Sequence, residues 1–209
     1  MTADAFSDLV LFAVCAWLAR VSLPTARACA GLGIAYVLIG LAALLGVLRF
    51  SSWSLVSDLV RGAHQFASLA AAVGAFPILA YSLAYPDSAL ARRLSGAWWL
   101  TFVVGGMGVA FWILGVKSWA QVVPALCGLW IATTAVRRWQ GRRKWLGVAG
   151  VGCLFASFAV VLLMPPGTHG SGLLSRTQLL HYSLALALSL IHSGREQARD
   201  ARTAPPEGT

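Results

Sequence analysis

Residues 61–84 read RGAHQFASLAAAVGAFPILAYSLA, and this stretch decides the class of fold. After Arg61, no charged residue occurs before Asp87. The run is longer than the ~20 apolar residues that a helix needs to cross the hydrocarbon core of a bilayer. Because every backbone polar group inside lipid has to be hydrogen-bonded within its own segment, this run is predicted to be a transmembrane helix.

The same pattern recurs along the whole chain. Of the 209 residues, 58% are apolar and only 11% are charged, whereas about a quarter of the residues in soluble domains are charged. The sequence therefore predicts an all-α polytopic membrane protein, in which residues 1–194 form one domain of seven transmembrane helices. The predicted spans are Ala5–Leu23, Cys29–Leu48, Gly62–Ala84, Ala97–Val116, Ser118–Val136, Trp145–Met164 and Thr177–Ser193.

The C-terminal segment 195–209, REQARDARTAPPEGT, differs in composition from the rest of the chain. It holds three of the seven acidic residues and two adjacent prolines. Polar, proline-containing segments of this kind cannot bury enough apolar surface to fold alone. We therefore expect a disordered tail.

The distribution of basic residues predicts how the protein lies in the membrane. The formal charge is +9, and twelve of the sixteen lysines and arginines fall in the first, third and fifth loops and the tail. The positive-inside rule then places the tail in the cytoplasm and the N-terminus outside. The cations sit in short loops, where they suit anionic lipid headgroups. We expect membrane lipids as partners, no nucleic acid, and a bacterial inner (plasma) membrane as the location.

The spans also suggest an internal repeat. The first and fifth spans each have a cysteine followed by a tryptophan, and the third and seventh each have an arginine followed by a histidine. Spans one to three and five to seven would then be parallel repeats joined by the fourth span. SWEET-type transporters have this 3+1+3 arrangement.

Polar side chains gather at the predicted outer ends of the spans. His64 and His181 lie at matching depths below the outer surface, and Asp8 lies near the outer end of the first span. An ionisable group inside a membrane span is costly unless it has a partner, so it indicates a site. The predicted ligand pocket consists of Asp8, His64, Gln65, His181 and Tyr182.

The same residue types allow more than one chemistry. Carboxylate and imidazole are zinc ligands, so a zinc site made by Asp8, His64 and His181, with His169 of the sixth loop as a fourth ligand, is one hypothesis. Two facing histidines could instead ligate haem iron. A polar ligand without a metal is a third hypothesis. Polar residues are also tolerated at helix ends without any such role.

The predicted topology resembles that of the CREST superfamily, which includes the alkaline ceramidases. Seven helices, an outside N-terminus and histidines in spans three and seven are the shared features. The resemblance implies a zinc-dependent amide hydrolase within the membrane. This chain departs from the motifs of that family. The second histidine of the HxxxH motif is replaced by Ala185, and the position of the family's serine is occupied by Val60.

Three functions are therefore consistent with the sequence. The first is binding or transport of a small or lipid-like molecule in the outward pocket. The second is a metal-dependent membrane hydrolase that acts on a lipid-like substrate. The third is an accessory subunit of a membrane complex, whose glycine-rich helix faces pack against a partner protein. The sequence contains no glycine-rich phosphate loop, GxSxG or HExxH motif to fix a reaction.

Overall fold

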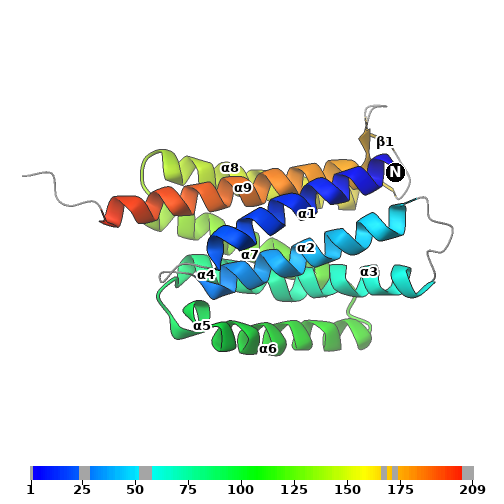
Figure 1. Cartoon of the computed structure of the whole chain (residues 1–209), viewed down its shortest axis with the longest axis horizontal. Helices are drawn as coiled ribbons and strands as arrows, with labels where there is room; N and C mark the ends of the chain where they lie inside the picture. The colour runs from blue at the N-terminus through cyan, green and yellow to red at the C-terminus, as the bar shows by residue number, and fades with distance from the viewer. Residues whose placement is uncertain (1, 24–28, 52–57, 166–168, 171–173, 204–209) are drawn as a thin grey trace, which may run out of the picture.

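The computed structural model describes residues 2–23, 29–51, 58–165, 169–170 and 174–203. These residues are almost all helical, as the sequence predicts (Figure 1). The helices are α1 (Ala3–Ser22), α2 (Ala30–Phe50), α3 (Asp58–Ala70), η1 (Ala71–Ala75), α4 (Phe76–Ala84), α5 (Ala89–Arg92), α6 (Leu94–Ile113), α7 (Trp119–Arg138), α8 (Arg142–Leu163) and α9 (Arg176–Thr203).

Six helices among the described residues are long and apolar enough to cross a membrane. They are α1, α2, the continuous helix Asp58–Ala84, α6, α7 and α8. Their number and composition indicate an integral membrane protein. The seventh predicted span lies within α9, which is not among the six because Gln178, His181 and His192 lower its hydropathy. The seven-span count and the orientation remain predictions.

The end of α9 differs from the sequence prediction. The helix continues to Thr203, although disorder was predicted from residue 195. Residues 195–203 contain neither proline nor glycine, and arginine, glutamate, glutamine and alanine all favour helix. The structure thus describes residues 195–203 as helix, residues 204–209 lie outside the described part of the chain, and the disordered tail stays a prediction.

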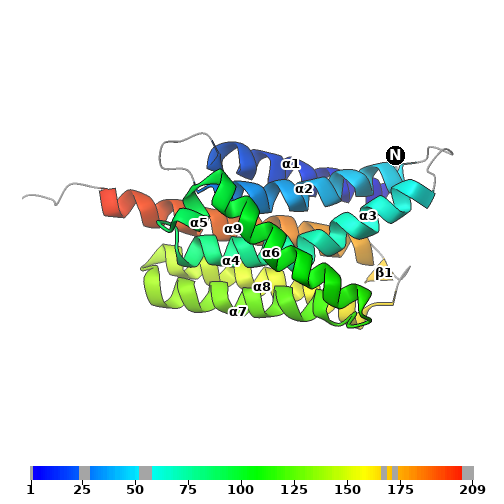
Figure 2. The same cartoon turned by 90° about the horizontal axis from the view of Figure 1, so that it is seen from below.

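The long helices pack side by side in one bundle. Helix α9 runs between α8 and α1 and contacts both along its length, and α1 packs on α2 (Figures 1 and 2). The first turn of α1 and the start of α9 lie at the same end of the bundle, where a short hairpin of β1 (His169–Gly170) and β2 (Leu174–Ser175) precedes α9. This pairing brings Asp8 and His181 to neighbouring helix faces.

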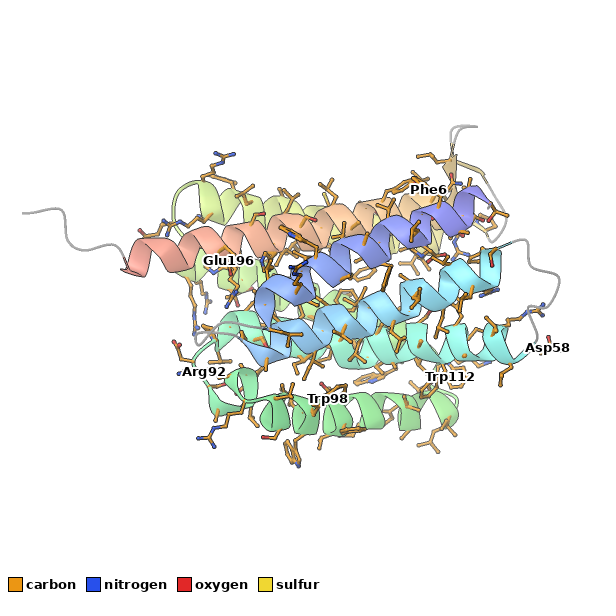
Figure 3. All side chains as sticks on the ribbon, viewed as in Figure 1. Phe6, Asp58, Arg92, Trp98, Trp112 and Glu196 are labelled. Carbon is orange, nitrogen blue, oxygen red and sulfur yellow. The ribbon has the colours of Figure 1, made fainter. Side chains whose placement is uncertain are left out.

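Helix α6, the fourth predicted span, lies at the edge of the bundle. Trp98 and Trp112 of this helix, labelled in Figure 3, are both exposed. It approaches the core through Gly105, where an added Cβ would lie 3.3 Å from the Cα of Gly74 in η1. Glycines permit such backbone contacts between membrane helices. This position suits the linker predicted for the fourth span, and the repeat itself remains a prediction.

The third predicted span is one helix with a wide turn at its centre. Between α3 and α4, residues Ala71–Ala75 form a π-helical turn, and the N–H of Phe76 bonds to the carbonyl oxygen of Ala71. Pro77 follows directly and has no N–H for the helical ladder, which favours such a distortion. π-turns are frequent at functional sites, and this one borders the cavity described next.

Candidate functional site

A cavity of about 570 Å³ lies inside the bundle. Residues from α1, α2, α3, η1, α4, α7, α8 and α9 line it, and none comes from α5 or α6. Its polar lining residues are Asp8, His64, Ser68, Gln121 and His181. All the remaining lining residues are apolar: Leu11, Ile39, Ala42, Ala43, Ala71, Ala72, Phe76, Ala120, Pro124, Ala125, Phe155, Phe158, Ala159, Val161, Leu162, Leu180 and Leu184.

Three predicted site residues meet at one end of this cavity. Asp8, His64 and His181 come from three different helices, yet all border the same space. His181 is the centre of the group, because its Nδ1 lies 3.2 Å from Oδ1 of Asp8 and 3.2 Å from Oγ of Ser7. The sequence placed these side chains at one depth, and the packing of α9 against α1 places them on facing sides.

Asp8 is completely buried, with 0% of its surface exposed. Neither of its carboxylate oxygens has a hydrogen-bond partner among the described residues, although His181 lies within ion-pair distance. Gly46 of α2 makes room for this carboxylate, since an added Cβ there would lie 2.4 Å from Oδ1 of Asp8. A buried, poorly paired acid costs folding free energy. Such a cost is typical of functional sites.

The proton on His181 can be located from its neighbours. The hydroxyl of Ser7 donates to the Asp4 carbonyl oxygen at 2.8 Å, so its own oxygen is free to accept. A carboxylate is also an acceptor only. Because both groups near Nδ1 accept, we assign the N–H to Nδ1 of His181. Nε2, on the other edge of the ring, is then an acceptor when the ring is neutral.

His64 has the same tautomer by the same reasoning. Its Nδ1 lies 3.1 Å from the carbonyl oxygen of Ala42, which can only accept. Its ring also meets the Phe50 ring edge-on, with centroids 6.1 Å apart. The ring is therefore held in place, and Nε2 has no hydrogen-bond partner among the described residues.

The other predicted site residues lie elsewhere. Gln65 is exposed, Tyr182 is half-buried, and neither lines the cavity. The backbone of His169 pairs with Ser175 in the hairpin, and the placement of its side chain lies outside what the structure describes. Gln65 and Tyr182 are thus separated from this cavity although their neighbours line it, because consecutive residues of a helix point in different directions.

The cavity also has lining residues that were not predicted for the pocket. Ser68 lies one turn after His64 on α3, and a search for polar residues at that helical spacing would have found it. Gln121 precedes Pro124 on α7, and Pro124 offers no N–H to the carbonyl of Ala120, another lining residue. No sequence signal marks Gly46 as the glycine that accommodates Asp8.

The zinc hypothesis is not supported by the arrangement of side chains. Among the described residues, no group of three or more histidine, cysteine, aspartate or glutamate side chains is arranged to hold a metal ion. Cys15, Cys29 and Cys127 are buried, and all four cysteines are unpaired. Asp8 and His181 form a pair, and His64 is directed by a backbone carbonyl instead.

A second histidine cluster lies nearer the C-terminal end of α9. Nδ1 of His192 is 3.3 Å from the hydroxyl of Tyr36, and both residues are buried. The imidazole ring also contacts the rings of Tyr36 and Trp17 edge-on. The structure shows His192 packed inside the bundle, and it does not line the cavity.

Comparison of the chain with family models, with curated proteins and with solved structures finds no match in any of the three.

Proposed function

We propose that this integral membrane protein binds a lipid-like molecule in the cavity, with the polar end of the ligand at Asp8, His64 and His181. The observation that carries the proposal is the cavity itself, which is apolar along most of its wall and polar at one end. Its volume of about 570 Å³ falls within the range of small-molecule sites. From the predicted orientation, this polar end faces outward.

The aromatic part of the cavity wall suits an apolar chain. Phe76, Phe155 and Phe158 line it, and the Phe158 ring meets the other two edge-on at centroid distances of 5.9 and 6.3 Å. Phe76 follows His64 by twelve positions along one helix, which corresponds to about 18 Å at 1.5 Å per residue. The lining therefore extends over much of a ~30 Å bilayer core, as an acyl or alkyl chain requires.

The set of helices around the cavity favours binding or transport over the two alternatives. It is lined by helices of predicted spans one to three and five to seven, which is where a transporter of the 3+1+3 type would hold its substrate. A metal-dependent hydrolase needs a ligand group that the described residues do not form. An accessory subunit has no need of a cavity lined by a buried acid.

Filling the cavity tests the proposal. Ala159 of α8 lines the cavity, whereas Ala156, one turn earlier on the same helix, is exposed. We expect Ala159→Phe to weaken the binding of radiolabelled dodecanol to the protein in nanodiscs by about tenfold or more, equivalent to ~1.4 kcal/mol. The control Ala156→Phe adds the same side chain on the outside and should bind dodecanol like the unmodified protein.

Empty nanodiscs give the background from partition of dodecanol into the bilayer. Saturable binding above that background, lost in Ala159→Phe alone, supports the proposal. Binding that equals the background in the unmodified protein contradicts it. Equal loss in both variants would also count against it, because the effect would then not depend on the cavity.

A further inference from the structure

The polar end of the cavity is unusual in offering mainly hydrogen-bond acceptors. With both N–H groups engaged at Nδ1, neutral His64 and His181 each leave Nε2 as an acceptor. The two rings line the same cavity. Asp8, behind His181, is also an acceptor. Ser68 and Gln121 can either donate or accept, so no fixed donor lines this end of the cavity.

The buried carboxylate of Asp8 favours a cationic group in the ligand. Asp8 is buried, and its oxygens lack hydrogen-bond donors among the described residues. The Arg49 guanidinium lies over the Phe50 ring, 5.0 Å from its centroid, and forms no ion pair with Asp8 in the described structure. Asp8 is thus left without a dedicated counter-charge.

We propose that the ligand carries a primary ammonium head group on an apolar chain. An ammonium has three donors and no acceptor, which complements a set of acceptors around a buried negative charge. The N–H groups of the ammonium would donate hydrogen bonds to Nε2 of His181 and to Nε2 of His64. Asp8 has no exposed surface of its own, so it is a positioning residue that acts on the ligand through His181, whose Nδ1 lies 3.2 Å from Oδ1 of Asp8. This inference rests on the proposed function and adds the chemistry of the head group.

Three ligands with the same chain test the inference. Dodecylamine, dodecanol and dodecanoate differ only at the head group, and each is measured in nanodiscs against empty discs. We expect the protein to bind dodecylamine at least about tenfold more tightly than dodecanol, and dodecanoate most weakly, because attraction across one imidazole ring is substantial in a low-dielectric site. Asp8→Asn should lower the ratio of amine affinity to dodecanol affinity by about tenfold.

Asp58→Asn is the matched control. Asp58 lies at the same end of the molecule as Phe6 of α1 (Figure 3), but it is exposed and faces Arg61 at 3.8 Å. The control removes the same charge from the surface and should leave the order of the three ligands unchanged. If Asp8→Asn cannot be purified, His64→Phe replaces it. That variant removes Nε2, keeps an aromatic ring beside Phe50, and should likewise lower the preference for the amine.

The outcomes separate the two proposals. If none of the three compounds binds above background, the cavity-binding function fails. If all three bind equally, in both the unmodified protein and Asp8→Asn, the cavity function stands and the ammonium head is wrong. Tightest binding of dodecanoate overturns the inference as well. Stoichiometric binding of zinc alone that is lost in His64→Ala would assign the acceptors to a metal ion instead.

Discussion

Two histidines on α9, three helical turns apart, show what separates a packed polar group from a candidate site. His192 is buried against Tyr36 and Trp17, and its Nδ1 has a hydroxyl partner at 3.3 Å. His181 has its Nδ1 engaged by Asp8 and Ser7, while its ring borders the cavity. The first cluster fills its space with aromatic rings. The second leaves space beside an acid that lacks hydrogen-bond donors.

The comparison predicts opposite responses to mutation. Around His192 the side chains are packed and hydrogen-bonded, so removing one should destabilise the fold. Around Asp8 a charge is buried at a cost, so removing it should stabilise the fold and impair binding. Functional sites commonly show this exchange between stability and activity.

The largest effect should come from Tyr36→Ala. Tyr36 has 0% of its surface exposed, contacts His192 through both its ring and its hydroxyl, and belongs to the hydrophobic core. Truncating a buried aromatic side chain costs about 3–5 kcal/mol. We therefore expect a strongly lowered melting temperature in detergent.

Tyr36→Phe separates the two contributions of this residue. It keeps the ring contact and removes only the hydroxyl partner of His192, which should cost about 1 kcal/mol. A melting temperature of Tyr36→Ala equal to that of the unmodified protein would show that the His192 cluster does not support the fold. Dodecanol binding by Tyr36→Phe should be unaffected, because Tyr36 does not line the cavity.

A smaller loss is expected where α8 meets the same half of α9. A Cβ added at Gly150 would lie 2.7 Å from Cγ1 of Ile191 and 2.9 Å from the Ala187 carbonyl oxygen. Because backbone cannot move aside as a flexible side chain can, Gly150→Ala should cost about 1–3 kcal/mol of unfolding free energy.

Gly152 on the same helix is the control, since nothing lies within 4 Å of a Cβ added there. Gly152→Ala should be neutral or stabilise the protein by up to about 1 kcal/mol through helix propensity. The melting temperatures of the two variants should therefore fall on opposite sides of that of the unmodified protein, or at least differ clearly. Identical values would mean that α8 and α9 are not packed as closely as described.

The sequence predicts the helical class well and the site only in part. Charge-free runs such as 62–84 define membrane helices by length and composition, so six of the spans are recognisable. The convergence of Asp8, His64 and His181 followed from their shared depth. Depth does not say which way a side chain points around its helix, so Gln65 and Tyr182 were included with their neighbours and do not line the cavity.

Other features depend on contacts between distant segments. The partnership of His192 with Tyr36 joins α9 to α2, and the role of Gly46 is visible only once α2 lies against α1. The length of α9 beyond residue 195 was not predicted for a different reason, which lies in the local sequence. The prediction for the tail was based on the whole segment, including the prolines at 205 and 206, although the residues just before these prolines favour helix.

Asp8→Asn is expected to have a small stabilising effect, in contrast to the losses of stability predicted at Tyr36 and Gly150. Asparagine has nearly the same shape, but it carries no charge and its amide can donate a hydrogen bond that a carboxylate cannot. Since both oxygens of Asp8 are buried without a hydrogen-bond partner among the described residues, the neutral variant should be more stable by about 1 kcal/mol. Asp58→Asn, at an exposed carboxylate, should change the melting temperature little.

Because a stabilised Asp8→Asn that has also lost its preference for dodecylamine cannot owe that loss to unfolding, the two measurements together isolate the function of the acid. A destabilised Asp8→Asn would instead place Asp8 in the same structural class as Tyr36, and the contrast between the two ends of α9 would disappear.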